Sequence, residues 1–128
     1  MGNPNPKVAV ILCGSGFKDG SEIRESVGTL WALSEHGAEF SCFAPNEQQK
    51  DVVNTYTGES TTEVRNSLVE AARIARGQIQ PLQEFSEANF DAVIFPGGFG
   101  VAKNLCTFAT QGSKASVHTG TKKVIDSM

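Results

Sequence analysis

Three apolar runs stand out along the chain, and each is followed by glycine or proline. They occupy residues 7–13 (KVAVILC), 38–44 (AEFSCFA) and 92–95 (AVIF). Short continuous apolar runs with such boundaries are typical of strands buried on both faces of a parallel sheet. We therefore expect three buried parallel strands at these positions.

Between and after these runs, apolar residues recur at the three- and four-residue steps of amphipathic helices. One such segment spans 21–36, with apolar positions at Ile23, Val27, Leu30, Trp31 and Leu33. A second spans 63–76, and weaker helical patterns follow at 101–108 and 117–125. Residues 46–62 are polar and rich in turn formers, so we expect a loop there.

Both ends of the first helix carry capping signals. Asp19 and Glu22 have the three-residue spacing of a capping box. At the other end, His36 followed by Gly37 is typical of a helix C-terminus. With a strand on either side, this helix predicts a right-handed strand–helix–strand unit.

The order of these elements predicts one α/β domain over residues 1–128. We expect the strand order second, first, third, which leaves the outer edge of residues 92–95 bare. Residues 112–128 contain no strand that could cover this edge, so the sheet is expected to be incomplete at its C-terminal side. A bare edge favours association, and we expect a homo-oligomer or a subunit of a larger complex.

Charge and composition exclude several classes of protein. The 11 basic and 14 acidic residues are spread along the chain for a net charge of −3, which argues against a nucleic-acid partner. No apolar run approaches the roughly 18 residues of a membrane span. Cys13, Cys42 and Cys106 form no CxxC pair and are interpreted as structural thiols of a reducing compartment, the cytoplasm. His36 and His118 are isolated, so we expect no metal site.

The loop after the first strand and the glycine turn after the third should face one crevice, because parallel α/β sheets bind ligands at the carboxyl ends of their strands. A glycine-rich loop that leads into a helix suggests a phosphate site, but its spacing is G-x-G-x-x-x-G rather than G-x-G-x-x-G. Three carboxylates beside it, Asp19, Glu22 and Glu25, would repel a phosphate. We therefore expect no dinucleotide, flavin or other cofactor.

Four residues at this crevice admit both a structural and a catalytic interpretation. Glu22 and Glu25 lie where carboxylates oppose the helix dipole, and this structural interpretation is the better supported from the residues alone. The alternative is that Glu25 shares a proton with a nearby nucleophile. For Gly97 and Gly98, a simple tight turn and a backbone oxyanion site are equally supported.

Five stretches of the chain together resemble the ElbB family, named for enhanced lycopene biosynthesis, within the PfpI-like, class I glutamine amidotransferase-like superfamily. These stretches are VILCGSG at 10–16, DGSEIRE at 19–25, CFAPN at 42–46, RNSLVEAARIARG at 65–77 and FPGGFGVAKNL at 95–105. The resemblance extends over nearly all of residues 7–112, and the combined motifs are specific.

The resemblance implies a flavodoxin-like (Rossmann-like) three-layer sandwich, usually dimeric, with glyoxalase- or deglycase-type activity on small 2-oxoaldehydes and no cofactor. In that superfamily a cysteine attacks the aldehyde, a glutamate hydrogen-bonds the cysteine, and backbone N–H groups hold the oxyanion. Matched by motif, the glutamate falls on Glu25 and the oxyanion turn on Gly98, which are the predicted catalytic residues. The predicted substrate-binding residues are Gly16, Glu22, Gly97 and Phe99.

The family's nucleophilic cysteine has no match in this sequence, because in the family it follows a strand beyond the helix near Val117. We therefore expect the N-terminal part of such a domain, truncated before the nucleophile elbow and inactive alone. The alternative is a non-catalytic interaction subunit whose open sheet edge is covered by a partner chain. The resemblance also leaves a mitochondrial or other organellar location as an alternative to the cytoplasm.

Overall fold

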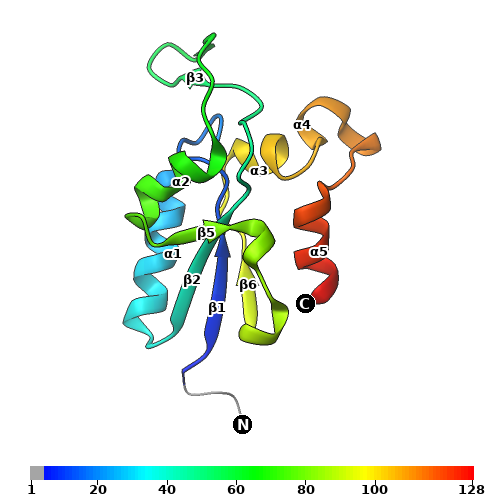
Figure 1. The fold of residues 1–128 in the computed structure, drawn as a ribbon. Coiled ribbons are helices and arrows are strands. Elements are labelled where there is room, and N and C mark those ends of the chain that lie inside the picture. The colour runs from blue at the N-terminus through cyan, green and yellow to red at the C-terminus, as the bar shows by residue number, and fades with distance from the viewer. Residues whose placement is uncertain (1–4) are drawn as a thin grey trace.

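Four parallel strands form the central sheet of the computed structural model, which describes residues 5–128. In order across the sheet, they are β5 (Ile79–Pro81), β2 (Glu39–Ala44), β1 (Lys7–Ile11) and β6 (Ala92–Ile94). The three predicted strands and their order are confirmed (Figure 1). The sequence did not predict β5, because three residues that end in proline contain no apolar run.

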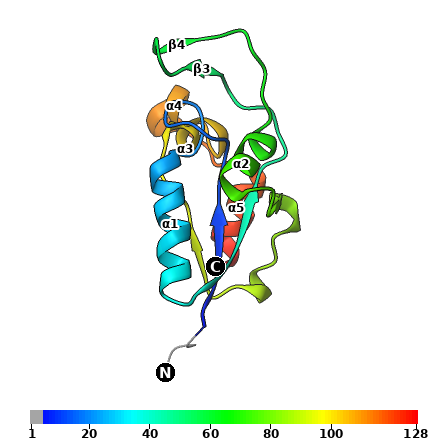
Figure 2. The same cartoon turned by 90° about the vertical axis from the view of Figure 1, so that its left-hand side faces the viewer.

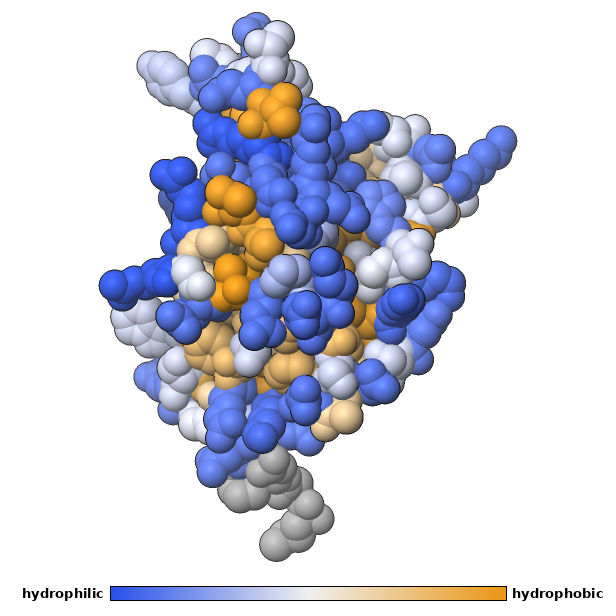
Figure 3. Space-filling model, viewed as in Figure 1, coloured by the Kyte–Doolittle hydropathy of each residue, from blue (hydrophilic) through white to orange (hydrophobic). Residues whose placement is uncertain are grey.

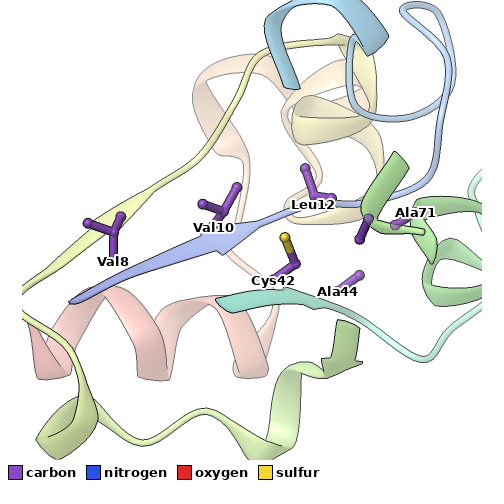
Figure 4. Packing of buried hydrophobic residues seen from close by; sticks show 7 residues of the cluster. Val8, Val10, Leu12, Cys42, Ala44 and Ala71 are labelled. Atoms are coloured by element: carbon purple, nitrogen blue, oxygen red, sulfur yellow. The ribbon is translucent and has the colours of Figure 1, made fainter. Parts of the chain in front are cut away.

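The central strand β1 is buried on both faces, as its continuous apolar run predicts. Because side chains alternate along a strand, successive residues from Val8 to Cys13 enter two opposite apolar clusters. Val8, Val10 and Leu12 belong to the cluster that also contains Ala71 (Figure 4). The core therefore lies on both sides of one strand, and this strand leads directly into the crevice loop.

Helices cover both faces of the sheet (Figures 1 and 2). On one face lie α1 (Ile23–Glu35) and α2 (Ser67–Ala75), where Ala71 is fully buried. On the other face lies α5 (Thr119–Ser127), whose Val124 is 2% exposed. The expected flavodoxin-like, three-layer α/β arrangement is confirmed.

Two short 3-10 turns connect β5 to β6 and complete the second cluster. They are η1 (Leu82–Glu84) and η2 (Glu87–Asn89). Beside them, the rings of Phe85 and Phe90 stack on each other, and each meets Phe43 of β2 edge-on, at centroid distances of 5.7 and 5.6 Å. These aromatic contacts anchor a connection that has little regular structure of its own.

The N-terminus of α1 is capped differently from the predicted capping box. Glu22 is the N-cap, and its carboxylate accepts a hydrogen bond from the backbone N–H of Glu25 at 2.7 Å. Asp19 takes no part, because its carboxylate accepts from the N–H of Val53 at 2.8 Å. A contact between segments distant in the sequence thus replaces the expected local one, whereas the predicted C-terminus at His36 is confirmed.

The second helix begins at Ser67 rather than at Glu63. Asn66 is its N-cap and accepts a hydrogen bond from the N–H of Val69 at 3.0 Å. The Asn66 side chain also donates to the side chain of Asn46 at 2.8 Å. This cap, which the sequence did not predict, ends the preceding non-helical segment.

Residues 46–62 contain a small hairpin where only a loop was expected. Its two strands, β3 (Val53–Asn54) and β4 (Glu59–Ser60), pair antiparallel. The hairpin projects from the carboxyl end of the sheet (Figure 1), and Tyr56 at its turn is 97% exposed. The hairpin contains no apolar run, because few of its side chains are buried against the rest of the protein.

The segment after β6 forms two short helices instead of the single helix predicted at 101–108. These are α3 (Phe99–Asn104) and α4 (Phe108–Gln111), and a 3-10 turn, η3 (Gly112–Lys114), leads on towards α5. The break occurs because the N–H of Thr107 donates to the distant carbonyl of Ser116 at 3.0 Å.

One apolar stripe of α1 is exposed, although its residues belong to the apolar positions from which the sequence predicts an amphipathic helix. Ile23, Val27 and Trp31 are 47%, 44% and 69% exposed, whereas Leu30 and Leu33 pack against the first cluster. On the face shown in Figure 3, apolar surface gathers around α2 and towards the middle of the molecule. The periodicity of the sequence identified the helix correctly, but it did not distinguish the apolar residues that face the core from those that face solvent.

Within residues 5–128, β6 and β5 are the two edge strands of the sheet, and β6 pairs only with β1. The edge that the sequence predicts to be open is open in this part of the chain. No helix in the same residues is both long and apolar enough to cross a membrane.

The observed start of α2 can be tested by replacing its cap. Asn66→Ala should lower the free energy of unfolding by about 1 kcal/mol, because the N–H of Val69 loses its acceptor. Glu63 lies outside the helix and its side chain is exposed, so Glu63→Ala should change the free energy of unfolding by less than about 0.5 kcal/mol. Urea unfolding measures both values, and a larger loss at Glu63 would contradict the observed helix start.

Candidate functional site

The loop after β1 and the turn after β6 meet at the carboxyl end of the sheet, as the sequence predicts. Three backbone hydrogen bonds join the two segments: Glu22 N–H to Gly97 O at 2.7 Å, Phe99 N–H to Phe17 O at 2.8 Å, and Gly100 N–H to Gly20 O at 2.9 Å. These bonds fix the distance between segments that are far apart in the chain. They form the floor of a crevice.

Glycine is required at this contact because the two backbones touch. A Cβ on Gly98 would lie 2.4 Å from the carbonyl oxygen of Gly20, and its φ of +120° is one that other residues rarely adopt. A Cβ on Gly100 would lie 2.3 Å from the Cα of Gly20. The turn is therefore more than a simple reversal of the chain, since it is also a close packing surface.

Glu25 reaches the same turn from the first turn of α1. A Cβ on Gly97 would lie 2.6 Å from Oε1 of Glu25, so the carboxylate rests directly against this glycine. Its neighbour Glu22 is held as the helix cap. The structure thus brings the two predicted catalytic positions, Glu25 and Gly98, to one place, while their roles stay predictions.

Backbone N–H groups at this turn differ in how they are satisfied. Those of Phe99 and Gly100 donate to the carbonyls of Phe17 and Gly20. For the N–H of Gly98, residues 5–128 provide no hydrogen-bond acceptor. This leaves a backbone donor at the turn that could stabilise an oxygen anion.

A pocket of about 640 Å³ opens beside the turn. Its lining comes from the crevice loop, α1, the turn and the two helices after it, and consists of Phe17, Glu22, Glu25, Phe95, Pro96, Gly97, Gly98, Phe99, Val101, Ala102, Cys106 and Phe108. Five of the six predicted site residues line this pocket. Gly16 does not, because it lies within the preceding loop, where its carbonyl accepts from the N–H of Gly20 at 2.8 Å.

Cys106 also lines this pocket, although the sequence suggested a purely structural thiol. It is partly buried, and its thiol donates to the carbonyl of Val101 at 3.4 Å. Its place depends on the break between α3 and α4, so no local pattern in the sequence could have revealed it. Cys13 and Cys42 are buried as expected, and burial raises the pKa of each thiol to about 11.

A buried asparagine on α3 holds the crevice loop in place. Asn104 is 6% exposed, and its amide donates to the carbonyls of Asp19 at 2.9 Å and Cys13 at 3.2 Å. Its oxygen accepts from the N–H of Lys50 at 2.9 Å. All of its main hydrogen-bonding groups are used, so it links three segments without leaving a buried polar atom unpaired. The sequence gave no signal for this role.

A neighbouring ion pair strengthens the same junction. Lys103 contacts the carboxylate of Asp51 at 3.0 Å and donates to the carbonyl of Lys18 at 2.8 Å. Both charged side chains are mostly buried, which makes the pair less exposed to screening by salt than a surface pair. Among residues 5–128, no group of three or more histidine, cysteine or acidic side chains could hold a metal ion.

Comparison with known proteins finds similar chains in animals. The rat (Rattus norvegicus) "ES1 protein homolog, mitochondrial" is 49% identical over 123 residues, which cover 95% of this chain and 46% of the relative. The human (Homo sapiens) "Glutamine amidotransferase-like class 1 domain-containing protein 3, mitochondrial" is 48% identical with the same coverage. The zebrafish (Danio rerio) "ES1 protein, mitochondrial" is 37% identical over 126 residues, which cover 94% of this chain and 47% of the relative.

A solved structure agrees with these relatives. An isoprenoid biosynthesis protein with an amidotransferase-like domain from Ehrlichia chaffeensis superposes with a TM-score of 0.88 at 43% identity, over 94% of this chain and 55% of that one. No protein-family model matches the chain. The chain spans about half the length of the relatives that it matches.

The environments of the three thiols predict an order of alkylation. At about pH 7.5, iodoacetamide should label Cys106 first, because the raised pKa values of Cys13 and Cys42 keep these buried thiols neutral. Their ordinary pKa of 9.0 applies in the unfolded chain, so stability should fall as the pH rises from 9.0 towards 11. Peptide mass spectrometry gives the labelling order, and early labelling of Cys13 would contradict its burial.

The close contact at the turn predicts opposite effects for two glycine substitutions. Gly98→Ala should lower the free energy of unfolding by at least about 2 kcal/mol, because strain and overlap with Gly20 add together. An added Cβ on Gly28 in α1 would meet no atom of residues 5–128 within 4 Å apart from its chain neighbours and its own helix backbone, so Gly28→Ala should raise the free energy of unfolding by roughly 0.5–1 kcal/mol. Urea unfolding of both variants provides the test. If Gly98→Ala left the free energy of unfolding unchanged, the backbones of Gly98 and Gly20 would have to lie further apart than described.

Proposed function

We propose that this chain, which belongs to the ElbB-like proteins of the class I glutamine amidotransferase-like superfamily, forms part of a glyoxalase- or deglycase-type site for small 2-oxoaldehydes. In this proposal Glu25 and the backbone N–H of Gly98 are catalytic. Gly97 shapes the turn, Glu22 and Phe99 contact substrate, and Gly16 supports the loop behind them.

The observation that carries this proposal is the contact of the Glu25 carboxylate with the glycine turn. Oε1 of Glu25 lies 2.6 Å from the position that a Cβ would take on Gly97, next to a Gly98 N–H without an acceptor in residues 5–128. A carboxylate and an oxyanion donor side by side are suited to carbonyl chemistry, in which a proton moves while an oxygen gains negative charge.

In the proposed reaction, a thiolate adds to the aldehyde carbon, and the carbonyl oxygen becomes an oxyanion held by the Gly98 N–H. Glu25 accepts the thiol proton and returns a proton to the substrate. Overall, one water is consumed and the 2-oxoaldehyde becomes a 2-hydroxy acid. The aldehyde carbon is oxidised while the ketone carbon is reduced, so no external redox cofactor takes part.

We place the attacking thiol outside the residues described, as the family resemblance implies. Within them, Cys13 and Cys42 are buried with a raised pKa, which disfavours the reactive thiolate. Cys106, by contrast, lines the pocket, and its substitution tests whether this thiol is the nucleophile. If Cys106→Ser reduced turnover as strongly as loss of Glu25, the nucleophile would be Cys106 instead.

We propose a mitochondrial location rather than the cytoplasm that the cysteine pattern suggested. Three relatives, between 37% and 49% identical to this chain, carry the word mitochondrial in their names. Both compartments keep thiols reduced enough for three free cysteines, so the thiols themselves do not separate them.

A second candidate function is that of a non-catalytic interaction subunit. The observation that favours it is the outer edge of β6, which has no partner strand within residues 5–128. Exposed strand edges pair readily with other chains. Native mass spectrometry of the protein purified from its own cells distinguishes a self-contained or homo-oligomeric enzyme from a subunit bound to a different polypeptide.

The catalytic proposal predicts a large effect of one conservative substitution. Glu25→Gln should lower kcat for methylglyoxal by about 10²–10⁴-fold and change KM little, because the amide cannot accept a proton. Glu35→Gln, at the far end of α1, is the matched control and should retain full turnover. Formation of lactate by the protein purified from its own cells is the readout. Absence of turnover of every 2-oxoaldehyde tested, methylglyoxal and larger ones, in the unsubstituted protein would exclude the enzymatic proposal and favour the interaction subunit.

A further inference from the structure

Exposed phenylalanines surround the mouth of the pocket beside the glycine turn. Phe17, Phe99 and Phe108 are 40%, 57% and 59% exposed, and they come from the crevice loop, α3 and α4. The rings of Phe17 and Phe99 lie with their centroids 6.5 Å apart at an interplanar angle of 49°. Large exposed aromatic side chains are unfavourable in water, and their convergence on one pocket points to an apolar ligand.

The charges at this pocket have a single sign. Its ionisable lining residues are Glu22, Glu25 and Cys106, and no lysine, arginine or histidine of residues 5–128 lines it. Lys18 stands over the ring of Phe17, 5.7 Å from the centroid, without lining the pocket. Lys103 is already paired with Asp51. A ligand that carries a carboxylate or a phosphate would therefore meet the carboxylates of Glu22 and Glu25 and no cationic side chain among the lining residues.

The size of the pocket also exceeds what the smallest 2-oxoaldehydes need. Its volume of about 640 Å³ falls in the range of sites that hold ligands of drug-like size. Aromatic faces and edges bind flat apolar rings, and their negative faces also attract organic cations. Shape, aromatic lining and charge thus point to the same class of ligand.

We propose that this pocket selects carbonyl compounds with an uncharged or cationic aryl group over those that carry a carboxylate or phosphate. The inference rests on the proposed function and specifies its substrate class as aryl 2-oxoaldehydes such as phenylglyoxal. Phe17 and Phe99 contact the aryl ring, and the carboxylates of Glu22 and Glu25 exclude anionic substituents. The reacting carbonyl lies towards Gly98.

Three unreactive ketones test this selection by binding alone. Acetophenone, its para-trimethylammonium derivative and 4-acetylbenzoate differ in charge but share the aryl ketone. Ligand-observed NMR titration of the full protein should find the first two bound, and the carboxylate bound at least about tenfold more weakly. Equal or tighter binding of 4-acetylbenzoate, or no binding of any of the three, would overturn the proposal.

Substitutions connect the binding to the named residues. Phe99→Ala should weaken acetophenone binding about five- to tenfold, whereas Trp31→Ala, which removes an exposed aromatic ring outside the pocket, should leave it unchanged. Glu25→Gln should strengthen 4-acetylbenzoate binding about fivefold, with Glu35→Gln as its charge-matched control. Equal effects of Phe99→Ala and Trp31→Ala would place the ligand elsewhere.

Binding and turnover separate this inference from the proposed function. If acetophenone binds as described but the protein turns over neither methylglyoxal nor phenylglyoxal, the catalytic proposal fails and the ligand class stands. If the protein turns over 2-oxoaldehydes with a kcat/KM for methylglyoxal that exceeds that for phenylglyoxal, the catalytic proposal stands and the aryl selection fails. Each result has a distinct meaning because the ketones cannot undergo the reaction.

Discussion

The backbone contact between the loop after β1 and the turn after β6 is the constraint on which the crevice depends. Gly98 and Gly100 lie so close to Gly20 that a Cβ on either would overlap its backbone. Glu22 donates across this contact to Gly97 and also caps α1. The start of α1, and with it the carboxylate of Glu25, is therefore positioned by the same contact that shapes the turn.

Polar side chains brace this contact from behind. The buried amide of Asn104 joins the crevice loop to the segment that precedes the hairpin, and Lys103 joins the same two segments through Asp51 and the carbonyl of Lys18. Loops at the ends of strands are commonly mobile, whereas satisfied buried polar networks make a local arrangement more nearly unique. The crevice thus combines loop chemistry with a rigid support, which is what a preorganised carbonyl site requires.

The two proposals for this protein concern adjoining parts of the molecule. The pocket follows the glycine turn, and the turn follows β6, whose outer edge is open within residues 5–128. A chain that paired with this edge would lie beside the pocket. Association and catalysis are therefore compatible, and the charge and aromatic lining of the pocket add a substrate preference that does not depend on the partner.

Local patterns in the sequence determined the central strands, their parallel order, the existence of α1 and α2, and the meeting of Glu25 with Gly98 at one crevice. This was predictable because buried strands and amphipathic helices have periodic signatures, and because parallel strands place their following loops at the same edge. Tertiary structure alone decided the cap of α1, the start of α2, the strand β5 and the exposure of the Trp31 stripe. It also placed Cys106 in the pocket and gave Asn104 its bracing role. These features depend on hydrogen bonds and packing between residues far apart in the chain, and a local pattern carries no information about which distant atoms will be nearby.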